Sequence, residues 1–476
     1  MTMKASIINK VVLIFITWTC SVVGLSQQSD SLTYYLEIAA KNNPTVMHRF
    51  NEYQAALQKV PQVGNLPDPQ LELGIFLSPM ELLSGNQAAD IKLMQMFPWF
   101  GVIKNAKDEM SLMAKAAYET FRDAKLQVYY DVQRTWYDLY SLRQKIQISE
   151  RNVELLKTIE RLTLVKFKSG SISGGSSASG GKMSGANIAT TSGSSGMNSM
   201  GGSNIASTSS GKAGTSGGSS MSSPSGGSGL SEVYRVQIEI SDLENNISIL
   251  KNEEQVVIAR FNGLLNRYLK TSVSTSELLP IKSLDKVYLT VSDSMIVTNP
   301  MLGMLRYEQQ SLQARTKMQK QMGLPMVGVG LNYSVINKSA MSTSAMNGQD
   351  MIMPMVTLSL PIYRKKYKTM QAETGFLKSA SEQNYQATAN ALQTEYYEAL
   401  QLYNDAQRRI ILYESQRQLT KKTLDISMKN FSSSASGLTD ILLIRQQLLD
   451  YELKNVEAVT DYNKAEAWIK RLIPNP

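Results

Sequence analysis

The sequence predicts a mostly α-helical fold in which two copies of one design, helix–strand–strand–long helix–helix, follow each other along the chain. Three observations support this prediction. Apolar residues recur every 3.5 residues over a long stretch without proline, a pair of alternating segments interrupts each half, and the same marker residues return in the same order. A chain of 476 residues could hold two or three ordinary domains, but helices of this length favour an assembly of rods.

The stretch 362–473 carries the helical signal. It contains no proline, and only Gly375 and Gly437 interrupt it. Gaps of four and three residues alternate between its apolar positions Tyr385, Ala389, Leu392, Tyr396, Ala399, Tyr403, Ala406, Ile410 and Tyr413. A 3.5-residue repeat keeps one seam against a partner helix in a left-handed supercoil. We therefore expect a coiled-coil helix over 365–431, about 100 Å long.

Four short segments alternate apolar with polar or small residues, as β-strands with one apolar face do. We place these strands at about 70–77, 90–97, 326–335 and 352–360. The pattern is typical of a lipid-facing strand with a wet interior, and a half-buried sandwich strand is the alternative. Four strands cannot close a useful barrel alone, but three copies of the chain would supply about twelve, a number that can close.

Marker residues repeat between the halves in unchanged order. The second half has Asn299-Pro300, Leu324-Pro325, Pro361, Phe431 and Gly437-Leu438-Thr439-Asp440 where the first has Asn43-Pro44, Leu66-Pro67, Pro98, Phe167 and Gly229-Leu230-Ser231-Glu232. The offset is 256–264 residues up to Phe431 and 208 after it, so the first half carries an insertion of about 56 residues. We place the first repeat at 27–269 and the second at 270–476.

Residues 1–26 have the pattern of a secretory signal peptide, with a positively charged start and an apolar run over 11–23. Cys20, the only cysteine, lies in this leader and could be a lipidation site. Trp18 and Thr19 stand where such sites carry small residues, which favours simple cleavage. The mature chain would then have no cysteine, which excludes disulfides, iron–sulfur clusters and thiolate zinc sites.

The formal net charge of +9 is spread along the helices without a dense basic run, which favours a solvated surface over a nucleic-acid interface. No run after the leader reaches the roughly 18 apolar residues of a membrane helix. An exported chain without such a helix is secreted, periplasmic, or held in an outer membrane by β-strands.

The insertion spans 169–229 and contains 17 of the chain's 30 glycines, many serines and no acidic residue. Such a composition does not bury enough apolar surface to fold. Its methionines Met183, Met197, Met200 and Met221 carry thioethers, which are soft ligands that suit Cu(I). The alternative is a tolerated flexible insertion in a chain that holds 25 methionines.

A second methionine group falls at the expected loop between the last two strands: Met341, Met346, Met351, Met353 and Met355. These methionines could form a path for soft metal ions, or they could simply fill irregular apolar gaps in the packing. His48 is the only histidine, so one chain cannot build a Ser/His/Asp or Cys/His catalytic constellation. We expect neither an enzyme nor a resident cofactor.

Over nearly all of 30–473 except the insertion, the chain resembles the TolC-like outer-membrane efflux proteins. The resemblance rests on the two-fold repeat, the strand pairs between long helices, and the hairpin-tip pattern of Phe, then Ser and Gly, then Leu-Ser/Thr-Glu/Asp. Within this family, Leu66-Pro67-Asp68-Pro69 and Gln95-Met96-Phe97-Pro98-Trp99-Phe100-Gly101 are similar to the heavy-metal branch, the CusC- and CzcC-like channels.

The resemblance implies a homotrimer with a 12-stranded β-barrel in the outer membrane and a tunnel of twelve long coiled-coil helices across the periplasm. It implies an inner-membrane pump and a periplasmic adaptor (membrane fusion protein) as partners, with outer-membrane lipid around the barrel. Aromatic residues near the strand ends would form an interfacial belt: Phe97, Trp99, Phe100, Tyr333 and Tyr363.

The same resemblance places the periplasmic aperture, where the adaptor would dock, at the hairpin tips near Phe167, Glu232, Phe431 and Asp440. Glu232 and Asp440 would form rings of acids that attract cations in a trimer. The alternative is that Glu232 and Asp440 only cap the starts of their helices and compensate the helix dipoles, which requires no role in transport.

We therefore expect a passive outer-membrane export duct of a tripartite efflux system, for heavy-metal cations such as copper and silver or cobalt, zinc and cadmium. Drugs or other small molecules are the alternative cargo. A secreted coiled-coil structural or adhesive protein is the alternative from a different class, and the strand pairs argue against it because a stalk needs none.

Overall fold

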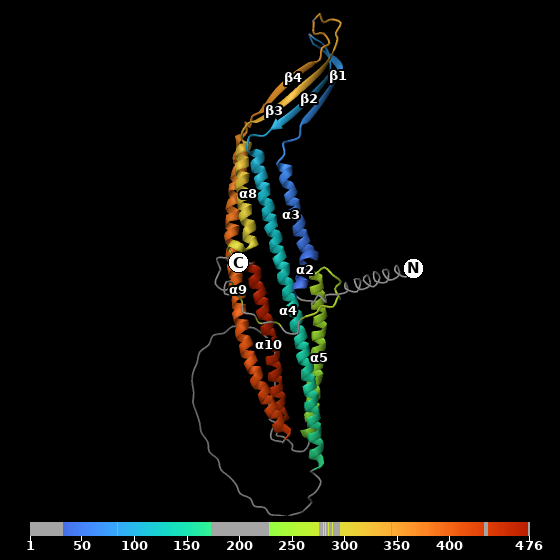
Figure 1. Ribbon diagram of the computed structural model, residues 1–476, viewed down its shortest axis with the longest axis vertical. Coiled ribbons are helices and arrows are strands. Elements are labelled where there is room, and N and C mark those ends of the chain that lie inside the picture. Colours follow the sequence, from blue (N-terminus) through green and yellow to red (C-terminus); the bar gives the residue numbers. More distant parts are fainter. Residues whose placement is uncertain are drawn as a thin grey trace, which may run out of the picture. The chain divides into compact units, whose positions relative to one another are not determined.

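The computed structural model describes residues 32–172, 228–275, 296–432 and 437–474, except 83 and 344, together with 279, 281, 284 and 288. The first repeat consists of α2 (Leu32–Asn42), α3 (Pro44–Val63), β1 (Gln70–Leu82), β2 (Gly85–Phe97), α4 (Val102–Ile172) and α5 (Ser228–Leu264). The second consists of α8 (Pro300–Met322), β3 (Met326–Asn337), β4 (Met351–Ser359), α9 (Arg364–Ser432) and α10 (Leu438–Leu472) (Figure 1). The predicted fold class and the order of elements are confirmed.

The chain divides into two compact units. Unit 1 comprises the chain up to Ile148, Ser248–Leu419 and the chain from Leu448, and it contains all four described strands. Unit 2 comprises Ser149–Ile247 and Thr420–Gln447. Among the described residues, no helix combines the length and the apolar character that crossing a membrane requires.

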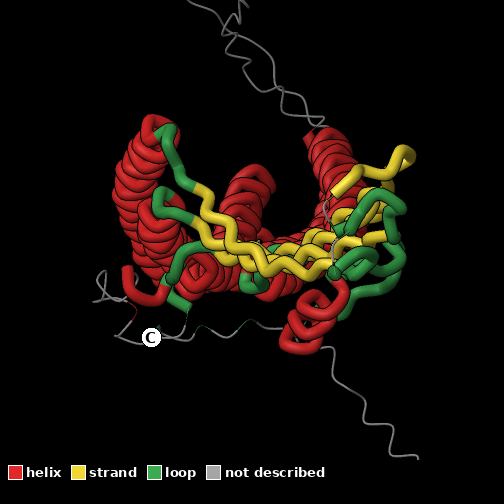
Figure 2. The backbone as a smooth tube through the Cα atoms, turned by 90° about the horizontal axis from the view of Figure 1, so that it is seen from above, coloured by secondary structure: helices red, strands yellow, loops and turns green. Residues whose placement is uncertain are grey.

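The four strands form one antiparallel sheet in the order β1-β2-β3-β4, and Figure 2 shows them side by side in a single layer. Their register sorts the side chains into an apolar and a polar face, because successive side chains of a strand point to opposite sides. One row of the apolar face joins Leu73, Ile91, Tyr333 and Ile352. The neighbouring row of the polar face joins Glu72, Lys92, Asn332 and Met353.

The first hairpin is longer than the alternating pattern suggests. β1 continues to Leu82, and β2 begins at Gly85, where we expected a loop. The register shifts between Ile75 and Met80, and this irregularity interrupts the alternation that marks a strand. Gly85 has a φ of 128°, which the tight connection requires and which favours glycine.

The expected loop position of the second methionine group was wrong for three of its members. Met351, Met353 and Met355 lie in β4, on the face opposite Ile352 and Val356, whereas Met341 and Met346 lie in the loop. The three methionines occupy every second residue, so they line the polar face of the sheet.

The predicted apolar seam of α9 packs into a hydrophobic core with α10. Leu392, Tyr396, Ala399, Tyr403 and Ala406 are buried there against Tyr462, Ala465, Ile469 and Leu472. The first repeat builds a matching core from α4 and α5, where Val128, Val132, Leu139, Phe261 and Leu265 are buried. The α4 residues match Leu392, Tyr396 and Tyr403 of α9, 264 residues further along. Both repeats therefore bury the same positions.

A buried asparagine joins two helix ends in each repeat. Asn43 accepts hydrogen bonds from the backbone N–H groups of Thr45 (2.9 Å) and Val46 (3.3 Å), and its Nδ2 donates to the carbonyl of Leu264 (2.8 Å). The side chain therefore caps the start of α3 and satisfies a carbonyl at the end of α5.

Asn299 repeats this arrangement in the second half. It accepts from the backbone N–H of Met301 (2.9 Å) at the start of α8 and donates to the carbonyl of Leu472 (3.1 Å) at the end of α10. The shared Asn-Pro dipeptide thus marks a structural joint. The proline takes the first helical position, where a backbone N–H would have no hydrogen-bond partner within the helix, so its missing N–H costs nothing.

Replacing Asn299 by alanine removes both functions of its side chain. We expect Asn299→Ala to lower the free energy of unfolding by about 1–3 kcal/mol, because a cap is lost and a buried carbonyl loses its donor. Asn299→Ser keeps the cap acceptor and should lose less. Urea unfolding followed by circular dichroism measures both, with Asn43→Ala as the matched variant of the first repeat. Wild-type stability of Asn299→Ala would contradict the joint.

Candidate functional site

The helix ends of unit 2 carry the four residues that the sequence places at the aperture. Phe167 and Phe431 lie near the ends of α4 and α9, and Glu232 and Asp440 lie near the starts of α5 and α10. The turns that join these helices, 173–227 and 433–436, lie outside the described residues, and so do Met183, Met197, Met200 and Met221.

Corresponding apolar residues of the two hairpins differ in exposure. Phe431 and Leu438 are each 2% exposed, whereas their counterparts Phe167 and Leu230 are 39% and 46% exposed. Phe431 packs under Lys166, whose ammonium nitrogen lies 4.2 Å from the centre of the ring. The second hairpin therefore buries its apolar end residues, and the first presents them at the surface.

The acidic residues lie on neighbouring helices. Arg235, the eighth residue of α5, donates a hydrogen bond to Thr439 Oγ1 in the first turn of α10 (3.3 Å), which joins the two helices near their starts. Glu232 is half-buried and Asp440 is exposed near this contact. Gln237, two residues further along α5, donates to Glu160 of α4 (2.7 Å).

A buried arginine in unit 2 is a feature that the sequence does not reveal. The side chain of Arg445 on α10 is only 3% exposed, and its Nη2 donates to Glu239 Oε2 of α5 (2.9 Å). Its Nε and Nη1 are buried without a hydrogen-bond partner. Burial lowers the pKa of Arg445, and the attraction of Glu239 opposes this change. The guanidinium group thus depends on one carboxylate.

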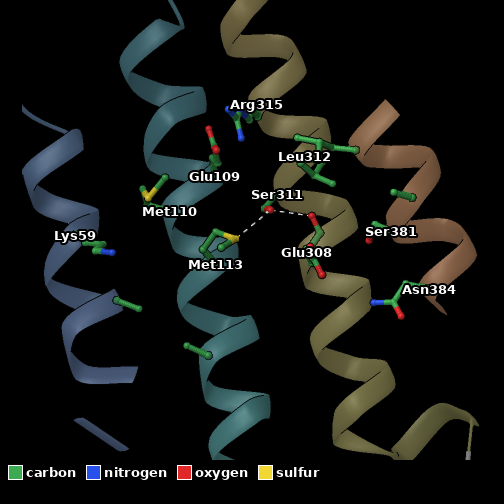
Figure 3. A pocket seen from close by; sticks show the side chains of 14 residues that line it. Lys59, Glu109, Met110, Met113, Glu308, Ser311, Leu312, Arg315, Ser381 and Asn384 are labelled. Carbon is green, nitrogen blue, oxygen red and sulfur yellow. Dashed lines mark hydrogen bonds between the residues drawn. The ribbon is translucent and has the colours of Figure 1, made fainter. Parts of the chain in front are cut away.

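A cavity of about 720 Å³ opens in unit 1 between α3, α4, α8 and α9 (Figure 3). Ser311 of α8 donates to the backbone carbonyl of Glu308 (2.7 Å) and contacts the sulfur of Met113 on α4 (3.3 Å). Glu109 of α4 and Arg315 of α8 face the same space.

Burial raises the pKa of the Glu109 carboxyl, and the positive charge of Arg315 works against this rise. Arg315 also lies 3.9 Å from Glu373 of α9. The cavity thus offers carboxylates, one guanidinium and thioethers, a mixture that suits binding of a polar small molecule or a cation.

A second, apolar cavity of about 460 Å³ lies where β2 passes into α4, between Leu66, Phe97, Trp99, Phe100 and Pro325. Phe100 and Tyr363, two residues of the expected aromatic belt, are highly exposed near the strand ends. His48 lies on the surface of α3, 3.7 Å from Glu52. Within the described ranges, no three His, Cys, Asp or Glu side chains gather to hold a metal ion.

The pair Arg445–Glu239 generates a test of unit 2. We expect Glu239→Gln to lower the free energy of unfolding by about 1–2 kcal/mol, because the buried guanidinium loses its charge-assisted hydrogen bond. Arg445→Met should cost less, since it removes the buried charge and keeps an unbranched side chain. Thermal unfolding and limited proteolysis measure the effect, with Glu253→Gln on α5 as control. Equal stability of Glu239→Gln and the control would contradict this dependence.

The sequence matches no protein-family model, and it matches no curated protein. The structure, in contrast, is similar to several solved outer-membrane proteins. The structure of CusC, described for its folding and transmembrane channel formation, has 13% sequence identity and a TM-score of 0.70 over 94% of this chain and 95% of that one.

Two further solved structures have the same arrangement. The outer membrane protein VceC from Vibrio cholerae has 12% identity and a TM-score of 0.66 over 93% of this chain and 96% of that one. The CmeC outer membrane channel of Campylobacter jejuni has 13% identity and a TM-score of 0.66 over 93% and 85%. Across nearly its full length, therefore, this chain has the fold of these outer-membrane proteins.

Proposed function

We propose that this chain is one subunit of a homotrimeric outer-membrane duct that passively exports small cargo as part of a tripartite efflux system. The single observation that carries the proposal is the four-stranded sheet, which has an exposed apolar face, an opposite polar face and two edges that its own chain leaves unpaired. The shared fold with outer-membrane channels supports it.

The apolar face of the sheet has the character of a lipid-facing surface. Ile75 on β1 is 79% exposed and Val356 on β4 77%, at opposite edges of the sheet, and Leu73 on β1 and Leu331 on β3 are also exposed. A contiguous exposed apolar surface marks a site of contact with lipid or another protein. The opposite face bears charged and amide groups, as the lumen side of a membrane strand does.

The sheet edges explain why one copy is insufficient. Among the described strands, β1 and β4 each pair on one side only. Unpaired backbone groups are costly in lipid, so the edges need partners. Because the strands alternate in direction, β4 of one copy would run antiparallel to β1 of the next. Three copies would then close about twelve strands, a number that forms a barrel.

The hairpin ends of unit 2 are the docking site that we propose for a periplasmic adaptor beneath an inner-membrane pump. The exposed Phe167 and Leu230 of the first hairpin supply apolar contact surface. In a trimer, Glu232 and Asp440 would place rings of acids at the aperture, which favours cations at the entrance. A passive duct of this kind needs no catalytic group.

Heavy-metal cations are the cargo class that we propose, and drugs or other small molecules are the alternative. The methionines of the chain support the metal class because thioethers are soft ligands. Growth of a deletion strain on copper, silver, zinc and cobalt, compared with growth on drugs, separates the two classes.

Cysteine cross-linking tests the closed trimer. We pair Ile75→Cys on β1 with a cysteine at Ile352, Pro354 or Val356 on β4, in a Cys20→Ser background that is otherwise free of cysteine. If copies join edge to edge, one register should yield cross-linked dimers and trimers in outer-membrane fractions, and nothing larger. The same cysteines placed singly are the control. A soluble monomer would contradict the duct and favour the secreted coiled-coil alternative.

Substitution of Ala399 tests the tunnel helix. Ala399 is fully buried in the α9–α10 core. We expect Ala399→Pro to abolish trimer assembly, because a proline inside a helix costs about 3 kcal/mol or more. Ala399→Ser keeps the backbone hydrogen bond and should assemble. Detergent-extracted oligomers are measured by light scattering, and a normal trimer of Ala399→Pro would contradict the role of α9.

A further inference from the structure

Methionines supply most of the apolar side chains on the polar face of the sheet. This face comprises alternate residues of 70–74, 90–96, 328–334 and 351–357, and its members include Glu72, Asp90, Lys92 and Asn332. Its apolar members are Met94, Met96, Met351, Met353 and Met355.

Two glycines of the central strand β3 leave bare backbone between these methionines. Gly330 lies between Met94 of β2 and Met355 of β4 in the register. Strands lie about 4.8 Å apart, so Met94 and Met355 face each other across about 9.6 Å with no side chain between them. A glycine inside a strand often marks a close approach of another group.

The side chain of Met96 lies over the other glycine, Gly328. A Cβ atom at Gly328 would lie only 2.5 Å from the sulfur of Met96, so Met96 places its thioether directly over β3. Gly328 and Gly330 are two residues apart on the same face, which puts the Met96 sulfur beside the space between Met94 and Met355. Three methionines thus flank the bare backbone of Gly328 and Gly330, and the sulfur of one of them, Met96, lies over it.

The charges near this patch are compatible with a bound cation. Lys92, one position from Met94 along the same face, forms an ion pair with Glu72 (3.2 Å). Asp90 further along β2 accepts a hydrogen bond from Ser334 (3.2 Å). Thr357 lies beside Gly328 on β4. The lysine charge is therefore compensated, and acidic groups share the face.

We propose that Met94, Met96 and Met355 bind a soft monovalent cation, Cu(I) or Ag(I), over the backbone of Gly328 and Gly330. Thioethers select such ions over hard cations, which prefer oxygen ligands. Met353 and Met351 follow at steps of about 6.6 Å along β4 and offer successive weaker contacts toward the loop. The cargo role of this site, though not the binding itself, rests on the proposed export duct.

Ag(I) binding to the purified full chain tests the site. A variant with Met94→Leu, Met96→Leu and Met355→Leu should bind one Ag(I) fewer per subunit, because leucine keeps the volume and lacks the sulfur. The matched control replaces Met47, Met301 and Met322, exposed on helices, by leucine and should bind as wild type does. Methionines of the insertion contribute equally to all of these proteins.

Gly328→Ala provides a second variant that keeps every sulfur. The new Cβ would occupy the position of the Met96 thioether, a flexible end that can move away. We expect Ag(I) to bind about 10- to 100-fold more weakly, the scale of a disturbed ligand orientation. In methionine-methyl NMR, the signals of Met94, Met96 and Met355 should shift together with Ag(I) in wild type.

The outcomes separate the site from the duct. Equal Ag(I) binding by the triple leucine variant and its control, in samples that form trimers, would overturn the site and leave the duct intact. Loss of one Ag(I) per subunit in a chain that forms no trimer would support the site and reject the duct. Folding of each variant is checked by circular dichroism.

Discussion

The sheet is the element on which the rest of the structure depends, because its own chain does not complete it. Among the described strands, β1 and β4 each leave one edge unpaired, and one face exposes apolar side chains such as Ile75 and Val356. The apolar face is unfavourable in water, and the unpaired edges would be costly in lipid, so a closed ring of strands within lipid would satisfy both. In the proposed trimer, the polar face would line a wet interior.

The two repeats keep the joints of the design and vary what lies between them. Asn43 and Asn299 cap a short helix and hold the end of a long one in the same way. The cores differ in detail, because Tyr403 and Tyr462 share a hydroxyl–hydroxyl hydrogen bond (2.8 Å) in the second repeat. The first repeat has Glu254 at the position that corresponds to Tyr462. Glu254 forms an ion pair with Arg143 (2.7 Å). At each joint the asparagine bonds backbone groups, which are present whatever the neighbouring side chains are. The joints are therefore the same in both repeats, whereas the core contacts differ.

Periodic features could be predicted from the sequence, since they depend on burial along one face. The seam of α9 is an example, because Leu392, Ala399 and Ala406 repeat at a spacing that only a coiled helix keeps together. The extent of β1 could not be predicted, because the irregularity between Ile75 and Met80 breaks the alternation.

Features that depend on partners distant in the chain could not be predicted either. Arg445 looks like a surface arginine until Glu239, some 200 residues away, is placed beside it. The unequal exposure of Phe167 and Phe431 is equally invisible to a repeat argument, because it depends on Lys166 and the neighbouring helices of unit 2. Residues at corresponding positions of two repeats can therefore have different neighbours and different exposure.

The position of the two glycines in β3 is related to the pairing of this strand within the sheet. Each glycine weakens a strand by roughly 0.5–1 kcal/mol relative to alanine, and β3 carries two of them. β3 has a partner on both sides, and its ladder of hydrogen bonds with β2 and β4 runs past both Gly328 and Gly330. The central strand can therefore carry bare backbone where a neighbour's thioether needs room, and Met96 occupies that room.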